Sequence, residues 1–362
     1  MSPDRNHFDP GQFDRRHFAL ALAAGLAACS RPVFGPPHFD PKVLDKGFPA
    51  LVERARPGMF AAAVMDLTTT ATWYGNANQP FPLGGLAVLP IAAALMAQID
   101  AKRVSLGEKI TVRDTDLSPP YSVIDDDWRD TPANFAMNIS VLDLLTLAVQ
   151  YGDNTAADVL MARIGGPGQV TAWLRQEGIG AMRVDRYARE TLVQVAGIAS
   201  FRPAWRTAKA FGEALKSVPV NDRQKAMETF LADPRDSTTS QDAMTLLFKL
   251  SRGALASKPS SDLLLTLMTP VRNAAGPQNA APLDAGPLSA VWPPTAAWAH
   301  RAADPRSDLG FTPVQNDIGL VTLKGGRRFA VAVLLSGSTA SAAQRTKLFS
   351  DTATLMLQAM GG

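Results

Sequence analysis

The order of apolar and polar residues predicts β-strands near both ends of the chain. Four short apolar or β-branched runs form two pairs, and the members of each pair are separated by only a few polar or glycine residues. Runs of this length with such short connections are typical of β-hairpins. The four runs span residues 59–67, 70–74, 317–323 and 329–335.

Helices are predicted before, between and after these strands, because apolar residues recur there every three to four positions. Residues 86–97 are apolar on all sides, which predicts a helix buried in the core, and the segment is too short to cross a membrane. Ser140 and the pair Asp153-Asn154 are typical first residues of helices. The other predicted helices span residues 41–56, 202–218, 221–232 and 342–360.

Strands at the two ends and helices in the middle favour a single sheet that both ends of the chain build together. We therefore predict an α/β (α+β) protein with an antiparallel sheet, flanking helices and an inserted all-helical subdomain. The α/β part comprises residues 43–84 and 290–362, and the helical part comprises residues 85–289.

The first 28 residues are predicted to be an export signal. Arg15 and Arg16 precede an apolar run of about ten residues, half the length that a membrane-spanning helix needs. The arginine pair resembles a twin-arginine export signal. Residues 26–29 (Leu-Ala-Ala-Cys) resemble the lipobox of bacterial lipoproteins, in which cleavage before the cysteine is followed by its acylation. The alternative is an ordinary signal peptide, with Cys29 as an incidental thiol.

Residues 29–42 contain Cys29 and several prolines, and are expected to form an extended tether. Together with the signal, they predict a periplasmic lipoprotein that reaches the membrane only through a lipid anchor at Cys29. We expect the protein to be a monomer.

The composition excludes several classes of protein. A chain with 46% hydrophobic and 19% charged residues can bury a large core, which excludes disordered chains and small disulfide scaffolds. One cysteine cannot form an internal disulfide, and only four histidines occur, so we expect no metal site and no cofactor. The net charge is +3 without a dense basic patch, so we expect no nucleic acid partner.

One region of the chain carries a specific family motif. Residues 151–158 (YGDNTAAD) are followed by residues 164–167 (IGGP) and 170–175 (VTAWLR). This region resembles the class A serine β-lactamases and related penicillin-interacting enzymes, and the resemblance covers most of residues 43–357. Shorter matches follow the family order at residues 81–83, 184–187, 236–239 and 316–319.

The resemblance implies acyl transfer by a serine nucleophile and a lysine base, which form an S-x-x-K motif. Aligned on residues 81–83, this chain has Gly85 at the serine position and Val88 at the lysine position. Neither side chain can attack a carbonyl group or accept a proton. No lysine of the chain has a serine three positions before it, so the motif occurs nowhere else.

The other family motifs are degenerate as well. S-D-N reads Gly152-Asp153-Asn154, and the best alignment of K-T-G falls on His300-Arg301-Ala302. Ala188 stands where the resemblance places the glutamate that activates the deacylating water, and Glu190 lies two residues further on. Removing catalytic residues that act as a unit abolishes nearly all rate acceleration. We therefore interpret the chain as an exported pseudoenzyme.

The degenerate cleft is expected to bind a peptidoglycan fragment or a periplasmic partner protein. Asp153, Asn154 and His300 are candidate binding residues, because the resemblance implies that the asparagine faces the substrate's amide. Asp153 and Asn154 would equally serve to cap a helix. Tyr121 resembles the aromatic residue at the lip of the family's cleft, where it would stack on a ligand or simply close the mouth.

Arg186 and Asp236 match a structural ion pair of the family's omega loop. They are fifty residues apart here, because an extra helical insertion at about 195–232 intervenes. The insertion would form a flap at the rim of the cleft, or it would only extend the core.

Two alternatives to the pseudoenzyme interpretation remain open. A hydrolase with a non-family nucleophile would pair His300 with Ser118 or Ser122, although a lone histidine is more often structural. A scaffold would use the helical insertion as a protein-binding surface and leave the cleft empty.

Overall fold

The structure, a computed structural model, describes residues 38–119, 122–124, 136–270, 286–303 and 306–361. The predicted export signal and Cys29 lie outside this range, and so does Tyr121. Within the described part, no helix has both the length and the apolar character needed to cross a membrane.

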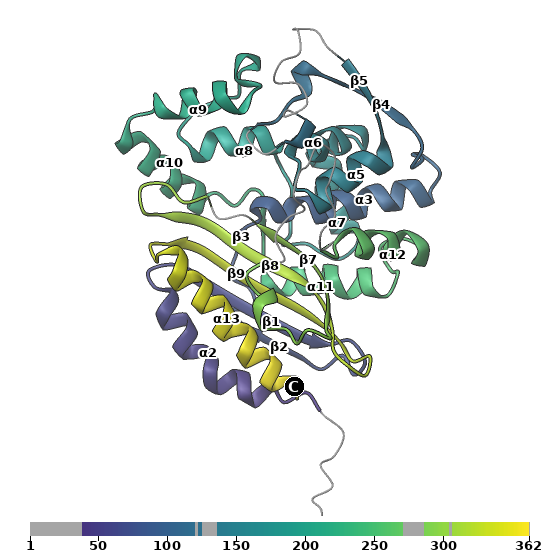
Figure 1. Ribbon diagram of the computed structural model, residues 1–362, viewed down its shortest axis with the longest axis vertical. Coiled ribbons are helices and arrows are strands. Elements are labelled where there is room, and N and C mark those ends of the chain that lie inside the picture. Colours follow the sequence, from purple (N-terminus) through teal and green to yellow (C-terminus); the bar gives the residue numbers. More distant parts are fainter. Residues whose placement is uncertain (1–37, 120–121, 125–135, 271–285, 304–305, 362) are drawn as a thin grey trace, which may run out of the picture. The chain divides into compact units, whose positions relative to one another are not determined.

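A five-stranded antiparallel sheet joins the two ends of the chain, with the strand order β2-β1-β9-β8-β7 (Figure 1). Strand β1 pairs with β9 along its whole length, from Met59 opposite Ser336 to Asp66 opposite Phe329. The hairpins β1-β2 and β8-β9 are the two that the sequence predicts. The strands span Met59–Asp66 (β1), Thr72–Gly75 (β2), Ala297–Ala303 (β7), Thr312–Thr322 (β8) and Arg328–Ser338 (β9).

Both faces of this sheet are buried, which explains why β1 and β9 are almost continuously apolar. Successive side chains of a strand point to opposite faces, and a strand covered on both sides needs apolar residues at every position. Ala62 and Val64 belong to the core beneath the terminal helices, whereas Ala61 and Ala63 belong to the larger core on the other side.

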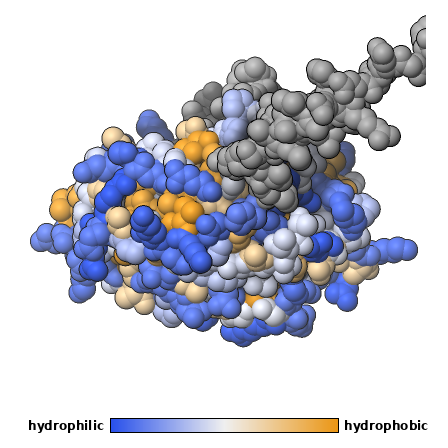
Figure 2. Space-filling model, turned by 90° about the horizontal axis from the view of Figure 1, so that it is seen from below, coloured by the Kyte–Doolittle hydropathy of each residue, from blue (hydrophilic) through white to orange (hydrophobic). Residues whose placement is uncertain are grey.

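Two helices from opposite ends of the chain cover the first face of the sheet. Helix α2 (Pro41–Ala55) and helix α13 (Ala342–Ala359) lie side by side there (Figure 1). An ion pair between Arg54 and Asp351, with 2.7 Å between Nη1 and Oδ2, links their outer sides. The face of the molecule seen from below, where these helices lie, is mainly hydrophilic with apolar residues between the polar ones (Figure 2).

The helical part is built around α3 (Val88–Asp100), which is preceded by a 3-10 turn at Gly84–Ala87. The first nine residues of α3 are all buried, as its uniformly apolar sequence predicts. Helix α11 (Ser240–Ser251) packs on the second face of the sheet. The other helices of this region are α5 (Val141–Gln150), α6 (Asn154–Arg163), α7 (Pro167–Gln176), α8 (Ala188–Val195), α9 (Ala208–Lys216), α10 (Val220–Ala232) and α12 (Lys258–Leu267).

The helical part contains one short ribbon, so the expected all-helical subdomain is corrected in this respect, and a second ribbon joins residues 81–82 of the α/β part to residues 237–238 of the helical part. Strands β4 (Lys109–Arg113) and β5 (Ala136–Ser140) form one pair, and β3 (Phe81–Pro82) and β6 (Ser237–Thr238) form the other. Their lengths of five and two residues give little periodic signal, and their pairing depends on contacts between distant segments.

One predicted helix is shorter than expected. The apolar pattern predicts a helix from residue 202, but α9 begins at Ala208. Pro203 starts a separate 3-10 turn, Pro203–Trp205, and the Thr207 hydroxyl then accepts a hydrogen bond from the Ala210 amide at 3.2 Å. Thr207 is therefore the N-cap, and the helix has little more than two turns.

Candidate functional site

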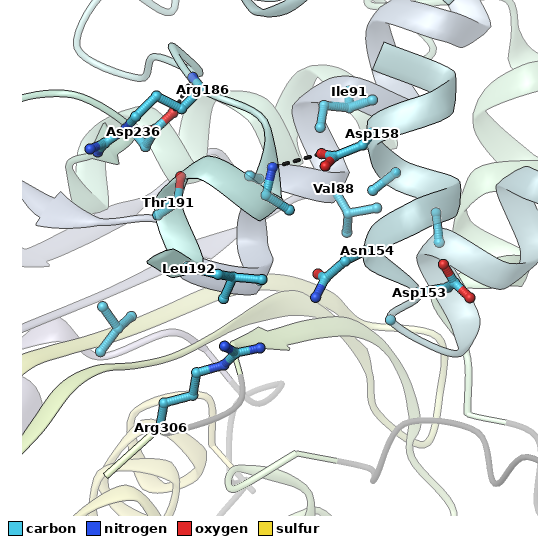
Figure 3. A pocket seen from close by; sticks show the side chains of 18 of the residues that line it. Val88, Ile91, Asp153, Asn154, Asp158, Arg186, Thr191, Leu192, Asp236 and Arg306 are labelled. Atoms are coloured by element: carbon cyan, nitrogen blue, oxygen red, sulfur yellow. Dashed lines mark hydrogen bonds and ion pairs between the residues drawn. The ribbon is translucent and has the colours of Figure 1, made fainter. Parts of the chain in front are cut away.

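A cavity of about 190 Å³ lies between the helical part and the sheet. Helices α3, α6 and α8 contribute to its wall, and α10 contributes Phe230. The turn before α3, the residues just before α6, the end of β7, the start of β8 and Arg306 contribute as well, and Figure 3 shows several of these side chains. Apolar side chains supply most of the lining.

The positions that the sequence alignment assigns to the family's catalytic groups meet in this cavity. Gly85 lies in the turn before α3, Val88 is the first residue of α3, Gly152 precedes α6, and Ala188 is the first residue of α8. All four line the cavity. No serine, cysteine or lysine is found among the described residues of its lining.

The structure has space for a side chain at Gly85, and Arg301 borders that space. A Cβ atom added to Gly85 would lie 3.4 Å from Cα of Ala303 and 3.6 Å from Nη2 of Arg301, which are ordinary contacts. Arg301 on β7 donates from Nε to the Gly85 carbonyl at 3.2 Å and from Nη1 to the Val149 carbonyl at 3.4 Å. A guanidinium group therefore borders the position where the family has its nucleophile.

Asp153 and Asn154 are adjacent in the sequence but have different roles. The Asp153 carboxylate is almost fully buried, caps α6 by accepting from the Ala156 amide at 2.8 Å, and also accepts from the Ile124 amide at 3.0 Å. Burial raises the pKa of this carboxyl group despite these hydrogen bonds. Asn154 points into the cavity instead (Figure 3), and its buried Nδ2 has no hydrogen-bond partner.

His300 does not line the cavity, so the expectation that it contacts a ligand there is corrected. Neighbouring side chains of a strand point to opposite faces, and the side chain of Arg301 lies on the cavity side of β7. His300 is buried, with 2.8 Å between its Nδ1 and Oδ1 of Asp317, and its ring stacks on Trp298 at a centroid distance of 5.1 Å.

The two serines considered as partners of His300 bind aspartates instead. Ser118 donates from Oγ to Asp158 at 2.7 Å, and Ser122 Oγ lies 3.1 Å from both carboxylate oxygens of Asp153. Both serines are buried. In the described part of the chain, the structure therefore does not assemble the serine–histidine pair that a non-family hydrolase would need.

Asp158 is a site residue that the sequence analysis did not identify. It lies on α6, is buried, and accepts hydrogen bonds from the amides of Ala188 at 2.7 Å and Arg189 at 3.3 Å (Figure 3). These are the first two residues of α8, where unpaired amides favour an anion. Burial is the largest influence on this carboxyl group and raises its pKa to about 6. An acid within an otherwise buried stretch of α6 is the signal that could have identified it.

Helix α8 itself occupies the position where the sequence analysis expected a loop. Glu190, considered as a displaced acid, caps this helix by accepting from the Tyr187 amide at 3.1 Å. The residues of α8 that line the cavity are Ala188, Thr191, Leu192 and Val195.

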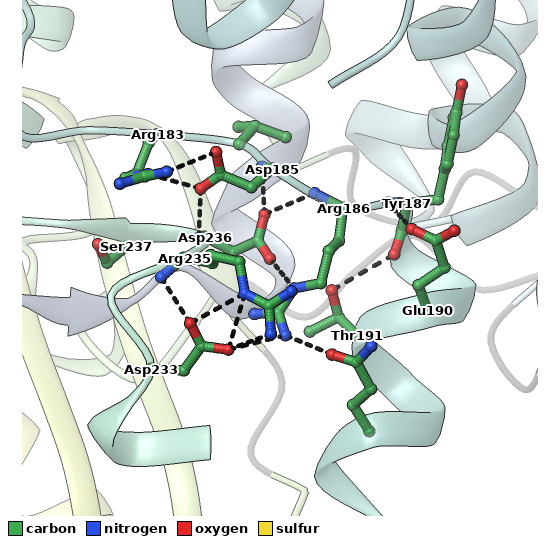
Figure 4. A network of polar contacts seen from close by, with 12 residues as sticks. Arg183, Asp185, Arg186, Tyr187, Glu190, Thr191, Asp233, Arg235, Asp236 and Ser237 are labelled. Atoms are coloured by element: carbon green, nitrogen blue, oxygen red, sulfur yellow. Dashed lines mark hydrogen bonds and ion pairs between the residues drawn. The ribbon is translucent and has the colours of Figure 1, made fainter. Parts of the chain in front are cut away.

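Arg186 and Asp236 form an ion pair, with 2.5 Å between Nε and Oδ2, at the edge of the cavity (Figure 4). Oδ1 of Asp236 also accepts from the amides of Asp185 and Arg186, at 2.6 and 3.1 Å. Arg186 Nη1 donates to Gln194 of α8 at 2.5 Å and to Asp233 at 3.2 Å. Its Nη2 is buried without a hydrogen-bond partner.

Two observations bear on cofactors. Among the described residues, no three side chains of histidine, cysteine, aspartate or glutamate are grouped as they would be around a metal ion. The three aspartates at the cavity are instead held by backbone amides, hydroxyl groups and arginines.

The chain matches the model of the β-lactamase enzyme family over residues 44–360. A β-lactamase of Rhodobacter capsulatus is 28% identical over 137 residues, which are 38% of this chain and 44% of that protein. The match thus spans less than half of that relative's length.

Solved structures of β-lactamases share the fold. A β-lactamase from Chitinophaga pinensis superposes with a TM-score of 0.67 and 22% identity, covering 88% of this chain and 99% of the other. A class A β-lactamase from Bacteroides cellulosilyticus gives 0.66 and 19%, covering 89% and 98%. At these identities the likeness concerns the fold alone. Because the family model spans nearly all of the sheet and the helical part, the chain belongs to the β-lactamase enzyme family.

Proposed function

We propose that this protein is a binding pseudoenzyme, which keeps the β-lactamase fold and its cleft but does not transfer acyl groups. The observation that carries the proposal is the meeting of Gly85, Val88, Gly152 and Ala188 in one cavity. Nucleophile, base, proton shuttle and deacylating acid are all replaced there by residues without a reactive group. Loss of one of these groups would be compatible with an altered reaction, whereas loss of the whole unit removes nearly all of the rate acceleration.

The ligand that we propose contains an amide group. Nδ2 of Asn154 is buried without a hydrogen-bond partner, and such a donor is costly unless a ligand or water accepts from it. A carbonyl oxygen is the natural acceptor. The family's chemistry with acylated peptides makes a cell-wall peptide fragment the first candidate, and fold-level analogy is the only support for that choice.

We also propose that the protein acts in the periplasm, anchored by a lipid on Cys29 and exported through Arg15 and Arg16. The support is the order of charged, apolar and small residues in positions 14–30. Labelled palmitate should be incorporated into the full chain in cells and should be absent from Cys29→Ser. Equal labelling of both proteins would contradict the anchor.

The absence of acyl transfer can be tested by intact-mass spectrometry. The full chain is incubated with a penicillin, a cephalosporin and a fluorophosphonate, with an active class A β-lactamase as the positive control. We expect the mass of the full chain to remain unchanged with all three reagents. A covalent adduct that maps to a serine would refute the pseudoenzyme proposal and identify the nucleophile.

Binding is tested with N-acetyl-D-alanyl-D-alanine by calorimetry and thermal shift, since a ligand that binds only the folded state raises Tm. We expect Asn154→Ala to weaken binding about tenfold, as expected for the loss of one hydrogen bond of about 1.4 kcal/mol. Asn138→Ala is the matched control, because Asn138 is exposed on β5 and does not line the cavity. Equal effects of both variants would argue against binding at Asn154.

A further inference from the structure

A cluster of basic side chains surrounds the turn that joins β8 to β9. Lys324 is exposed in the turn, Arg327 ends it, and Arg328 is the first residue of β9. Arg252, which follows α11, donates from Nη2 to the Leu67 carbonyl at 2.6 Å, and the Leu67 amide donates to the Arg328 carbonyl at 2.9 Å. We call this cluster the basic end and define it by Arg252, Lys324, Arg327 and Arg328.

The basic end carries an excess of positive charge. Arg327 has one acidic neighbour, the buried Asp66, with 3.6 Å between Nη2 and Oδ2. The other three members form no ion pair with any residue that the structure describes. Asp262, which lines a groove together with Arg328, is paired with Lys258 instead. Exposed and half-buried cations without a protein partner are free to attract an external anion.

Helix α2 begins at the same end of the molecule. The ring of Phe39, just before α2, lies 6.2 Å from the ring of Phe329, and the Arg327 guanidinium lies over that same Phe329 ring at 4.9 Å. The start of α2 and the β8-β9 turn both lie in the lower part of Figure 1, whereas α9 lies at the opposite end. The first turns of α2 add no net charge, since they contain two lysines and two aspartates: Lys42, Lys46, Asp40 and Asp45.

The position of Phe39 limits which end of the protein can approach a membrane that holds Cys29. Cys29 is ten residues before Phe39. A fully extended chain spans at most about 3.5 Å per residue, so these ten residues reach no further than about 35 Å. A domain of this size has a diameter of about 50 Å. An anchor at Cys29 therefore holds the basic end close to the membrane, and α9 further from it.

The shape of the turn permits close contact with a flat surface. Gly325 and Gly326 have φ values of 90° and 84°, which favour glycine, and neither has a side chain to hold the turn away from its partner. Attraction to anionic lipids falls off within a Debye length, about 8 Å at physiological ionic strength. Lys324, next to these glycines, is therefore placed where the attraction is strong.

We infer that the basic end docks on an anionic phospholipid surface, which the lipid at Cys29 holds within reach. None of the exposed large apolar side chains in the described ranges belongs to the β8-β9 turn, so the contact is electrostatic and does not enter the hydrocarbon. The inference rests on the proposed function for the lipid anchor, and on the described residues for the docking surface. One acyl chain binds a membrane only reversibly, and a basic surface supplies a second attachment.

Vesicle sedimentation tests the contact without the lipid anchor. The full chain carrying Cys29→Ser is mixed with vesicles of equal parts phosphatidylglycerol and phosphatidylcholine, or of phosphatidylcholine alone. We expect binding to the anionic vesicles only. Raising the salt from about 0.1 M to about 1 M shortens the Debye length from about 10 Å to about 3 Å and should abolish the binding.

Neutral substitutions locate the contact. Lys324→Gln should weaken binding about fivefold, and Lys324→Gln with Arg328→Gln about 25-fold, because each removes a cation near the surface. The matched control is Lys209→Gln with Lys225→Gln, which removes two exposed lysines from α9 and α10 and should change binding by less than about twofold. All variants carry the same N-terminal segment, so their differences report on the described part. Thermal unfolding checks that each variant is folded, and Lys324 is an exposed turn residue whose change leaves the core intact.

The outcomes separate this inference from the lipid anchor. Equal weakening by the two pairs of substitutions would show attraction by the overall charge and would overturn the inference. Binding that Lys324→Gln leaves unchanged would overturn it as well. Palmitate labelling of the parent chain reports on the anchor independently. Labelling without vesicle binding would overturn the docking surface alone, whereas binding through the basic end without labelling would overturn the anchor alone.

Discussion

Gly85 and Gly152 occupy positions that the sequence alignment assigns to serines of two family motifs, and their backbones differ. Gly152 has a φ of 71°, which lies in the left-handed region that residues with a Cβ atom avoid. Gly85 lies in a right-handed 3-10 turn, and a Cβ atom would fit there in ordinary contact. The backbone conformation at Gly152 therefore disfavours any residue with a side chain, whereas the conformation at Gly85 does not.

This difference predicts opposite effects of the same substitution. Gly152→Ser should lower the free energy of unfolding by about 1 to 2 kcal/mol because of the left-handed backbone. Gly85→Ser should change it by less than about 0.5 kcal/mol. Urea denaturation of the two variants and the parent chain checks this, and equal costs at both positions would contradict the argument.

At the scale of elements, the Asp158 carboxylate connects α6, which lines the site, to the first turn of α8. Helix α8 then leads into the insertion. Asp158 is bound by the first turn of α8 and by Ser118, but its burial outweighs these contacts and raises its pKa from 3.8 to about 6. Between pH 3.8 and about pH 6, Asp158 is protonated in the folded protein and ionised in the unfolded chain. The free energy of unfolding therefore falls as pH rises through this window, and it is constant with respect to this group above about pH 6.

Asp158→Asn should remove this pH dependence while keeping the shape of the side chain. The free energy of unfolding of the variant, relative to that of the parent, should rise by about 2 kcal/mol from pH 4 to pH 7. Thermal or urea unfolding across this range measures it. Asp262→Asn, in an exposed ion pair with Lys258, serves as the control, and parallel curves for Asp158→Asn and the parent would refute the assignment.

Elements with strong local patterns were predictable from the sequence, and elements set by distant contacts were not. Local residue patterns predict helix α3, the hairpin β8-β9 and the cap of α6 at Asp153. Helix α8 has only eight residues, and its N-terminus depends on Asp158 thirty residues earlier. The face of the sheet to which the His300 side chain points follows from the register of β7 against β8, and a single sequence does not specify this register.

At the scale of the whole molecule, the network around Arg186 ties the two segments that flank the insertion. Residues 183–186 and 233–236 are joined by Arg186–Asp236 and by backbone amides that donate to both Asp185 and Asp236. Arg186 and Asp236 are almost fully buried, so their charges depend on each other. The cavity wall that α8 forms is therefore linked to this pair through Gln194.

Removal of one charge from the pair should be costly. Asp236→Asn keeps the size of the side chain and an acceptor for the Asp185 amide, but leaves Arg186 with less compensation. We expect the free energy of unfolding to fall by about 3 kcal/mol. The exposed variant Asp262→Asn should cost less than about 1 kcal/mol. A similar small cost for both variants in urea denaturation would show that the buried pair contributes little.

The proposal that the cleft does not transfer acyl groups can be tested further by introducing the first family motif. Gly85→Ser and Val88→Lys together supply a nucleophile that fits beside Arg301 and a base one helical turn later, buried at the start of α3. The proton shuttle is still missing at Gly152, and Ala188 still cannot activate water, so a penicillin should form at most a slow adduct without turnover.

The control, Gly85→Ala with Val88→Lys, lacks the nucleophile and should form no adduct. Mass spectrometry follows the adduct and absorbance follows hydrolysis of the β-lactam. Rapid turnover by the Gly85→Ser and Val88→Lys protein would mean that the remaining residues still form a working site, and that only two side chains separate this chain from an enzyme.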